Sequence, residues 1–491
     1  MNYKMVLRTV GRLLWAEAFF LLFPMFVSLY YKENLFHIYL IVIGLLLCVG
    51  GIMNLPKPEK RTLYAREGFV IVSLSWILMS LFGALPFFLS REIPSFVDAV
   101  FEVVSGFTTT GATILTDIEA VSKSLLFWRA FTHWLGGMGV IVFVLAFLPQ
   151  KDMQSMHILR AEVPGPSVGK LVSKATATAR ILYVMYAALT VAQIIALICC
   201  RMPLFDSVTT AFATAGTGGF SVKNASIAAY NSLPIEIVCT LFMLLFGINF
   251  NLFYLIIMKQ FKRAFKSEEL WTYLGIVAIT IGIITLNIMP LVGSFTQALR
   301  QSGFQVVSVI TTTGFVTADF NQWPVLSQTL LITLMFIGAC AGSTGGGLKV
   351  GRIIILFKSA IRELRRTTNP RRIKGIRLDG TALDKETISA TGMYFVVYMM
   401  VIAVSLLLVS LNNLDFTTTF SSVVTCINNV GPGLSLVGPV ENFSDLSALT
   451  KLVLATDMLI GRLEVLDVME KKAEKAMKES LVKDEYAALA E

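Results

Sequence analysis

The 491-residue sequence is 55% hydrophobic and only 15% charged, and its mean hydropathy is +0.72. Too few residues are charged to form a water-exposed surface. The composition therefore excludes a soluble globular protein and indicates a polytopic membrane protein. The net charge of +9 does not indicate a nucleic-acid partner, because the basic residues gather in alternate loops between apolar segments.

Ten apolar segments approach the length needed to cross about 30 Å of hydrocarbon as α-helices. Continuous runs of this kind favour helices over a β-barrel. The first run follows Lys4, Arg8 and Arg12 and lacks a small-residue cleavage signal, so we expect it to be retained as a span. The segments cover residues 13–31, 35–55, 68–90, 125–149, 181–200, 234–258, 270–293, 325–357, 388–411 and a last one beginning near 446.

Lysine and arginine are distributed unequally between alternate loops. Residues 57–66, 151–180, 259–269 and 358–385 hold 22 of them, whereas residues 91–124, 201–233, 293–324 and 412–448 hold 5. The positive-inside rule therefore predicts that the first set and the N-terminus face the cytoplasm of a prokaryotic-type membrane. The basic stretch 362–377 is either part of this orientation signal or a docking surface for an acidic partner or lipid headgroups.

Four segments repeat the same order of a short apolar stretch and a glycine-centred turn. The turns are TTTGAT at 108–113, TAGTGGFS at 214–221, TTTGFVT at 311–317 and NNVGPGL at 428–434. The stretches before them, at 95–107, 204–215, 304–310 and 414–427, are too short to cross a bilayer and predict re-entrant half-helices. With Gly111, Gly218, Gly314 and Gly431 taken as equivalent, the sequence predicts an all-α fold of two leading helices and four span-loop-span repeats, arranged with pseudo-fourfold symmetry around one pore.

A glycine turn at membrane depth must be enclosed by protein or line a water-filled cavity. Backbone carbonyls aimed at one axis can replace the water around a cation, and glycine reaches the required positive φ at little steric cost. The half-helices would point their negative C-terminal ends at the same axis. The alternative is that each turn only closes a helical hairpin. Asp98, Asp206 and Asp415 lie near the half-helix starts, where a carboxylate either caps the helix or attracts ions.

The glycine-rich segment 338–351, GACAGSTGGGLKVG, predicts a break in the span 325–357, because glycine costs up to about 1 kcal/mol in a helix interior. A broken helix that lines a cavity suits a gate, and the alternative is close helix packing through small residues. Lys349 would add positive charge there or reach the cytoplasmic interface. Arg462 is a charge within the last span, so it faces a cavity or an ion-pair partner such as Asp457 or Glu464.

Other polar residues in apolar segments carry weaker signals. We expect Glu102, Arg129, His133, Asn249 and Asn251 to bond the half-helices or one another rather than an ion. The six cysteines lie mostly in apolar segments without a CxxC pair, which favours packing over disulfides or zinc. The sequence contains neither GxxxxGK[ST] nor a GxGxxG after a strand, so nucleotide sensing would require a separate protein.

Several motifs together resemble the TrkH/TrkG/KtrB superfamily of potassium-uptake proteins, and its TrkH branch most closely. They are the four turns, FWRAFTHWLGGMGVIV at 127–142, RAEVPGP at 160–166 and AGSTGGGLKVGR at 341–352. The resemblance implies the K+-translocating pore subunit of a Trk-type uptake system in the cell inner membrane, with K+ bound in its filter, no enzymatic activity and no organic cofactor. It also implies a homodimer in the lipid bilayer and a cytoplasmic TrkA-like regulatory ring that binds NAD(H) or ATP, with no nucleic-acid partner.

The resemblance also implies two sites. The K+ selectivity filter would comprise Thr109, Thr110, Gly111, Thr217, Gly218, Thr312, Thr313, Gly314, Asn429, Val430 and Gly431. The gate would comprise a movable intramembrane loop with Gly345, Gly346, Gly347 and Lys349, together with Arg462 below the filter. Relatives that favour sodium commonly carry serine at the first filter position, so Gly111 favours potassium. The competing function is a K+/Na+ or K+/H+ symporter that works by alternating access, for which inverted repeats would be expected.

The expected organisation is a pair of leading helices, four pore repeats and a tail. Their ranges are 1–66 for the helices, 67–150, 151–260, 261–358 and 359–466 for the repeats, and 467–491 for the tail. The tail departs from the family's pattern, because an apolar stretch usually completes the last span there. It carries 7 acidic residues and 5 lysines, which predicts a polar amphipathic helix and a short last span.

Overall fold

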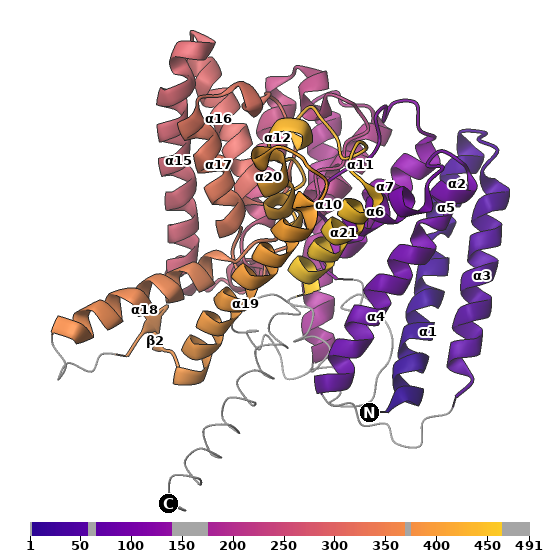
Figure 1. The fold of residues 1–491 in the computed structure, drawn as a ribbon, viewed down its shortest axis with the longest axis horizontal. Coiled ribbons are helices and arrows are strands. Elements are labelled where there is room, and N and C mark those ends of the chain that lie inside the picture. Colours follow the sequence, from indigo (N-terminus) through magenta and orange to yellow (C-terminus); the bar gives the residue numbers. More distant parts are fainter. Residues whose placement is uncertain (1, 57–64, 140–174, 369–374, 464–491) are drawn as a thin grey trace, which may run out of the picture.

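The computed structural model describes residues 2–56, 65–139, 175–368 and 375–463. This part of the chain is almost entirely helical, apart from a small hairpin in which β1 (Arg377–Leu378) pairs antiparallel with β2 (Thr381–Ala382). Six helical segments within it are long and apolar enough to cross a membrane, and a pair of helices bent by 91° would make a seventh span. The chain is therefore a multi-pass, all-α membrane protein, as its composition predicts (Figure 1).

Two leading spans precede the repeats. α1 (Tyr3–Phe20) continues into α2 (Leu22–Tyr30), and α3 (Phe36–Asn54) packs beside α1. The two helices approach closely through glycine, since a Cβ on Gly11 would lie 2.8 Å from the carbonyl oxygen of Gly50. α1 also packs against α4 and so attaches the leading pair to the first repeat.

Each of the four repeats contains a first span, a half-helix and a second span. The first repeat comprises α4 (Ala65–Gly83) with α5 (Leu85–Leu89), α6 (Phe96–Phe107) and α7 (Lys123–Gly137). The second comprises α10 (Ala175–Cys199), α11 (Leu204–Gly216) and the bent pair α12 (Leu233–Phe246) and α13 (Phe250–Ile257). After α14 (Phe261–Ala264), the third comprises α15 (Glu268–Val292), α16 (Phe295–Ile310), α17 (Val325–Ile337) and α18 (Val350–Thr368). The fourth comprises α19 (Lys385–Ser410), α20 (Phe416–Ile427) and α21 (Ala448–Leu463).

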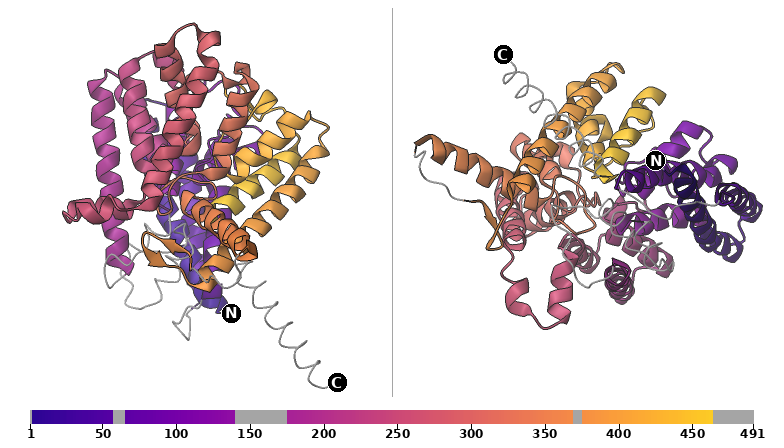
Figure 2. Two further views of the ribbon diagram at one scale, coloured as in Figure 1. Left: turned by 90° about the vertical axis from the view of Figure 1, so that its left-hand side faces the viewer. Right: turned by 90° about the horizontal axis from the view of Figure 1, so that it is seen from below.

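The repeats form a closed ring through contacts between second spans and half-helices. α7 packs against α11 of the second repeat, α12 against α16 of the third, and α17 against α20 of the fourth. The ring closes because α21 packs against α6 of the first repeat. In the view from below, the repeats follow one another in chain order around a common centre (Figure 2, right). Buried apolar side chains fill the ring in two cores, one mainly around the leading helices and repeats 1 and 4, the other around repeats 2 and 3.

Several expected helices differ in extent. The span expected over 234–258 turns through 91° between α12 and α13. The span expected over 325–357 ends at Ile337 and resumes at Val350, so the predicted break is confirmed. α16 begins at Phe295 rather than at residue 304. Polar residues in its first turns interrupt the apolar spacing, so the sequence pattern does not indicate this earlier start. Residues 140–149 of the fourth expected span, the RAEVPGP stretch and the polar tail lie outside the described residues.

Candidate functional site

The four turns share one backbone conformation, in which a left-handed residue is followed two positions later by a glycine with positive φ. The pairs are Thr109 (φ 55°) and Gly111 (84°), Thr217 (55°) and Gly219 (77°), Thr312 (57°) and Gly314 (78°), and Asn429 (54°) and Gly431 (101°). The equivalence expected for Gly218 is therefore displaced by one residue, and Gly219 is the counterpart of the other three glycines. A threonine two positions before the glycine marks this register in the first three repeats.

The turns contact one another in ring order through these glycines. A Cβ on Gly111 would lie closer than 3.0 Å to the carbonyl oxygen of Gly218. The same is true of Gly219 against the Thr313 oxygen, Gly314 against the Val430 oxygen, and Gly431 against the Thr110 oxygen. Each glycine thus leaves room for the carbonyl of the residue that precedes the next repeat's glycine. Because the fourth turn contacts the first, the four carbonyls form a closed ring.

A cavity of about 130 Å³ opens on this ring and is lined by all four glycines. Lys223, Asn224 and Glu441 lie on its wall. Lys223 pairs with Glu119 at 2.9 Å, and this hydrogen bond holds the pKa of Glu119 below its ordinary range. The Asn224 amide likewise donates to Asp117 at 2.9 Å and lowers the pKa of that carboxyl. The mouth of the cavity is therefore polar and holds ionised side chains of both signs.

The half-helices direct their C-termini at the ring. They end at Phe107, Gly216, Ile310 and Ile427, each directly before its turn. The unpaired carbonyls of a helix C-terminus carry a partial charge of roughly −0.5. Four such ends around one ring create a negative potential that favours a cation.

The carboxylates at the opposite ends of the half-helices have structural partners. Asp415 caps α20, since it accepts a hydrogen bond of 3.0 Å from the amide of Thr418. Asp98 in the first turn of α6 pairs with Lys451 of α21 at 2.7 Å. Asp206 in the first turn of α11 accepts a hydrogen bond of 2.7 Å from the Tyr230 hydroxyl. Only Asp415 is therefore a cap among these three, and the other two carboxylates join elements.

The glycine-rich loop between α17 and α18 lies against the turns of the third and fourth repeats. The amide of Gly346 donates a hydrogen bond of 2.6 Å to Oγ1 of Thr312. A Cβ on Gly346 would lie closer than 3.0 Å to the Asn428 carbonyl oxygen, and one on Gly345 would lie 3.0 Å from that of Thr311. These contacts involve residues that precede Gly314 and Gly431, whereas the cavity is lined by the ring glycines and residues after them. The loop and the cavity therefore lie on opposite sides of the ring.

The break between α12 and α13 accommodates this loop. The amide of Cys340 donates to the Gly247 carbonyl at 3.1 Å, and the amide of Phe250 donates to the Gly342 carbonyl at 3.0 Å. Each interrupted helix thus satisfies backbone groups that the other leaves unpaired, which non-helical backbone at membrane depth requires.

Two ionisable residues hold the ends of the loop. Lys349 is 2% exposed, and its ammonium donates a hydrogen bond to the Gly345 carbonyl, so it does not extend to an aqueous interface. Glu269 of α15 accepts hydrogen bonds of 2.8 Å from the amides of Ala341 and Gly351. One buried carboxylate therefore ties both ends of the loop to the first span of its own repeat.

Arg462 of α21 joins the loop to the first repeat. Its guanidinium donates to the Thr344 carbonyl at 2.8 Å, to the Gly136 carbonyl at 2.6 Å and to the Gly137 carbonyl at 2.8 Å. The last two carbonyls belong to the C-terminal end of α7, where a cation is favoured by the helix dipole. Of the two ion-pair partners considered for Arg462, Asp457 accepts a hydrogen bond of 2.6 Å from Ser405, and Glu464 lies outside the described residues.

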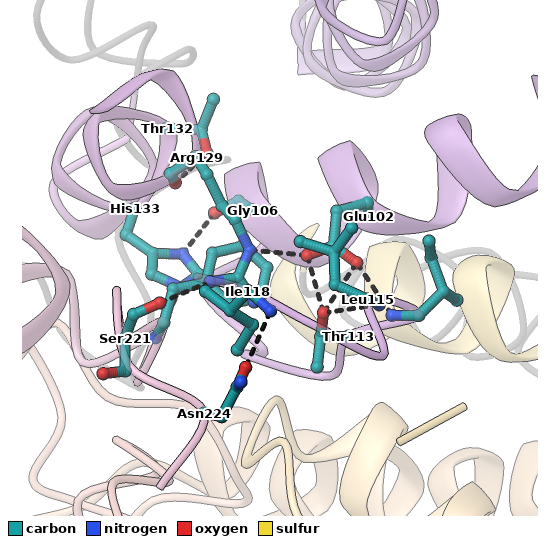
Figure 3. A network of polar contacts seen from close by, with 12 residues as sticks. Glu102, Gly106, Thr113, Leu115, Ile118, Arg129, Thr132, His133, Ser221 and Asn224 are labelled. Atoms are coloured by element: carbon teal, nitrogen blue, oxygen red, sulfur yellow. Dashed lines mark hydrogen bonds and ion pairs between the residues drawn. The ribbon is translucent and has the colours of Figure 1, made fainter. Parts of the chain in front are cut away.

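A buried polar network lies beside the first two turns (Figure 3). Glu102 of α6 and Arg129 of α7 form an ion pair of 2.6 Å, and His133 bonds the Gly106 carbonyl at 2.7 Å. These residues bond one another and a half-helix, as expected from the sequence. Among the described residues, no group of three or more His, Cys, Asp or Glu could hold a metal ion. The turns themselves offer oxygen atoms from backbone carbonyls, from threonine hydroxyls and from the side-chain amides of Asn428 and Asn429.

Four re-entrant half-helices whose turns close into one ring define a membrane protein of the four-repeat pore-loop class. A family model described as TrkH, cation transport protein, matches residues 36–481. The chain belongs to this TrkH family, and it is a membrane transport protein and not an enzyme.

Individual relatives agree with this assignment over nearly the whole chain. The Trk system potassium uptake protein TrkH of Escherichia coli K12 is 37% identical over 476 residues, which cover 96% of this chain and 98% of that protein. The Trk system potassium uptake protein TrkG of the same organism is 32% identical and covers 95% and 97% of the two chains. The crystal structure of the potassium transporter TrkH from Vibrio parahaemolyticus is similar with a TM-score of 0.85 at 33% identity, over 96% of this chain and 98% of that one.

Proposed function

We propose that this chain is the potassium-translocating pore subunit of a Trk-type uptake system. The observation that carries the proposal is the ring of four carbonyls, from Thr110, Gly218, Thr313 and Val430, between the cavity and the glycine-rich loop. The relatives at 37% and 32% identity are named potassium uptake proteins, which supports potassium as the ion. The ion is cargo, and no covalent step is required.

The filter would select by coordination. A cation that enters from the cavity loses water, and the ring carbonyls, with further carbonyls and hydroxyls of the turns, would replace it. The half-helix C-termini stabilise the positive charge without moving. Gly111 leaves space for the Gly218 carbonyl, and serine at this position would displace that oxygen. Gly111→Ser is therefore expected to admit more sodium.

The glycine-rich loop would be the gate, in a closed position. Its segment Gly345–Gly347 has no side chains, so the loop backbone can lie directly against the turns and obstruct the path of an ion. Arg462 would contribute twice, by holding the loop through Thr344 and by placing a positive charge below the ring. Lys349, bonded to Gly345, would add to the same barrier.

The partners follow from the family and from the charge of the chain. The relatives are named as parts of a Trk system, which supports a separate regulatory component, proposed as a cytoplasmic TrkA-like ring that binds NAD(H) or ATP. α18 directly follows the gate loop and carries the half-buried Lys358 and Arg362 and the exposed Arg365 and Arg366, and these basic residues suit docking of that regulator. The chain would act as a homodimer in the inner membrane with a cytoplasmic N-terminus.

Recording from the purified chain in planar bilayers with asymmetric KCl tests the proposal. We expect unitary currents that reverse near the potassium equilibrium potential. Saturable flux without unitary steps, driven by a sodium or proton gradient, would instead support the symporter. The parallel arrangement of the repeats, each of which brings its turn to the same ring, favours the pore, because alternating access is commonly built from inverted repeats.

A further inference from the structure

The ion pair between Glu102 and Arg129 is buried next to the filter and plays no part in the proposed coordination. Its side chains are 0% and 3% exposed. Removal of two charges from water costs so much that a buried pair seldom stabilises a protein more than apolar residues of similar size would. The role of this pair is therefore better sought in the groups that it positions.

Glu102 holds the exit of the first turn, and Arg129 holds that of the second. The Glu102 carboxylate accepts hydrogen bonds of 2.9 Å from both the Thr113 hydroxyl and the Ile114 amide, as well as 2.6 Å from Nε of Arg129. The other arm of the guanidinium donates to the Ser221 carbonyl at 2.9 Å. Figure 3 shows the resulting bridge from Thr113, through the ion pair, to Ser221.

Two rings strengthen the hold on the second turn. The Arg129 guanidinium lies 3.4 Å from the centre of the Phe220 ring, and the His133 ring stacks on the same Phe220 ring, with ring centres 4.1 Å apart. The Phe220 amide donates to Nε2 of His133 at 3.3 Å, so Nδ1 carries the proton and donates to the Gly106 carbonyl. The chain on both sides of Phe220 is thus fixed to α7, directly after Gly219.

Other repeats show that holding a turn does not need a charge. In the third repeat, Gln305 stands where Glu102 stands in the first, seven residues before the left-handed residue. With its amide oriented to satisfy its neighbours, Gln305 accepts from the Thr317 amide at 2.8 Å. In the fourth repeat, the Ser421 hydroxyl accepts from the Leu434 amide at 3.0 Å. The charge of Glu102 is needed only for Arg129, which reaches the neighbouring turn.

We propose that Glu102 and Arg129 are positioning residues that fix the first filter turn relative to the second and thereby set the selectivity between potassium and sodium. The inference rests on the proposed function. The two turns meet where the Gly218 carbonyl lies against Gly111, so a shift of one turn changes the spacing of ring oxygens. Potassium and sodium differ in the oxygen cage that best replaces their water, so the spacing affects the two ions unequally.

Glu102→Gln and Arg129→Lys separate this role from simple folding. Glutamine keeps the hydrogen bond to Ile114, as Gln305 does in the third repeat, but leaves Arg129 without its counter-ion. Lysine keeps a cation beside Glu102 but lacks the fork that also reaches Ser221. We expect each to raise the sodium-to-potassium permeability ratio by roughly tenfold, because each removes a charge-assisted hydrogen bond.

The measurement is the bi-ionic reversal potential of the full chain in bilayers, with thermal unfolding recorded for each variant. Glu236→Gln is the matched control, since it breaks the pair with Arg300, also 2.6 Å long, which joins α12 to α16 and does not bridge two of the turns. It is expected to leave the reversal potential unchanged.

The outcomes distinguish the inference from the proposed function. If wild-type protein passes no potassium-selective current, the proposed function fails. If wild type is selective and a folded Glu102→Gln or Arg129→Lys variant keeps the wild-type reversal potential, the pair is structural only and the inference is overturned. Should Glu102→Gln fail to fold, Arg129→Lys alone decides, because it retains the ion pair.

Discussion

Replacement of Thr312 by valine tests the contact between the proposed filter and the proposed gate loop. Valine preserves the shape of the side chain and removes Oγ1, which accepts the 2.6 Å hydrogen bond from the Gly346 amide. Gly346 is buried where the loop backbone lies against the turns, which is the proposed closed position. Withdrawal of the loop would expose it to the ion path and its water.

The size of the expected shift in gating follows from the Gly346 amide, which Thr312→Val leaves without an acceptor. A buried donor without an acceptor costs about 1–3 kcal/mol. The substitution would destabilise the closed state alone, because water can bond the Gly346 amide once the loop has moved. The equilibrium between closed and open states is therefore expected to shift toward open by about 5- to 150-fold.

Open probability in single-channel records of the chain without its regulator measures this shift. Thr312→Ser retains the acceptor and should behave as wild type. Thr217→Val is the matched control, because Thr217 occupies the equivalent position but its hydroxyl bonds the Gly216 carbonyl of its own turn at 2.6 Å. Equal open probabilities for Thr312→Val and Thr217→Val would refute the reasoning, because a general loss of filter hydroxyls would then explain both.

The sequence predicts features whose cause is local. Glycine-rich sequence from Gly338 onward cannot sustain a helix, so the break in the third repeat is predictable, and the short apolar stretches before the turns predict the half-helices. The register of the second turn is harder to predict, because Gly218 and Gly219 are adjacent and either could be aligned with the glycines of the other turns. A threonine two positions earlier gives Gly219, provided that the turns are aligned on that residue as well as on glycine.

Contacts between repeats could not be predicted, because their partners are distant in the chain. No proline or run of glycines in the sequence indicates the bend at Gly247. The bend is stabilised by the Cys340 amide of the third repeat, which donates to the Gly247 carbonyl. Arg462 gave a signal as a charge in an apolar span, but its partners, Thr344 and Gly136, are main-chain carbonyls that any residue type could supply. Polarity therefore identifies such a residue, while only the fold identifies its contacts.

Three further predictions concern the loop, the ring and a half-helix. Arg462→Ala removes the bond to the Thr344 carbonyl and a charge below the ring, so potassium current should increase in recordings without regulator; an unchanged current would contradict the gate assignment. Gly219→Ala places a methyl group closer than 3.0 Å to the Thr313 carbonyl oxygen, on a residue with a φ of 77°. It should therefore reduce potassium selectivity in bi-ionic recordings. Wild-type selectivity of this variant would argue against Gly219 as the counterpart of the other three glycines. Asp415→Ala removes the cap of α20 and should destabilise the protein by about 0.5–2 kcal/mol in thermal unfolding, whereas Asp415→Asn should retain most of the stability.

The bonds of the glycine-rich loop restrict how a gate built from it could open. Both ends are tied by amides of Ala341 and Gly351 to the Glu269 carboxylate, which is 8% exposed. Detachment of the whole loop would strand this carboxylate and both amides inside protein, where water cannot replace the bonds. The bond between Gly346 and Thr312 is different, because it would face the proposed ion path, where water could replace each partner as the loop withdraws. Opening by withdrawal of the middle of the loop, with the Glu269 bonds intact, therefore requires the least free energy.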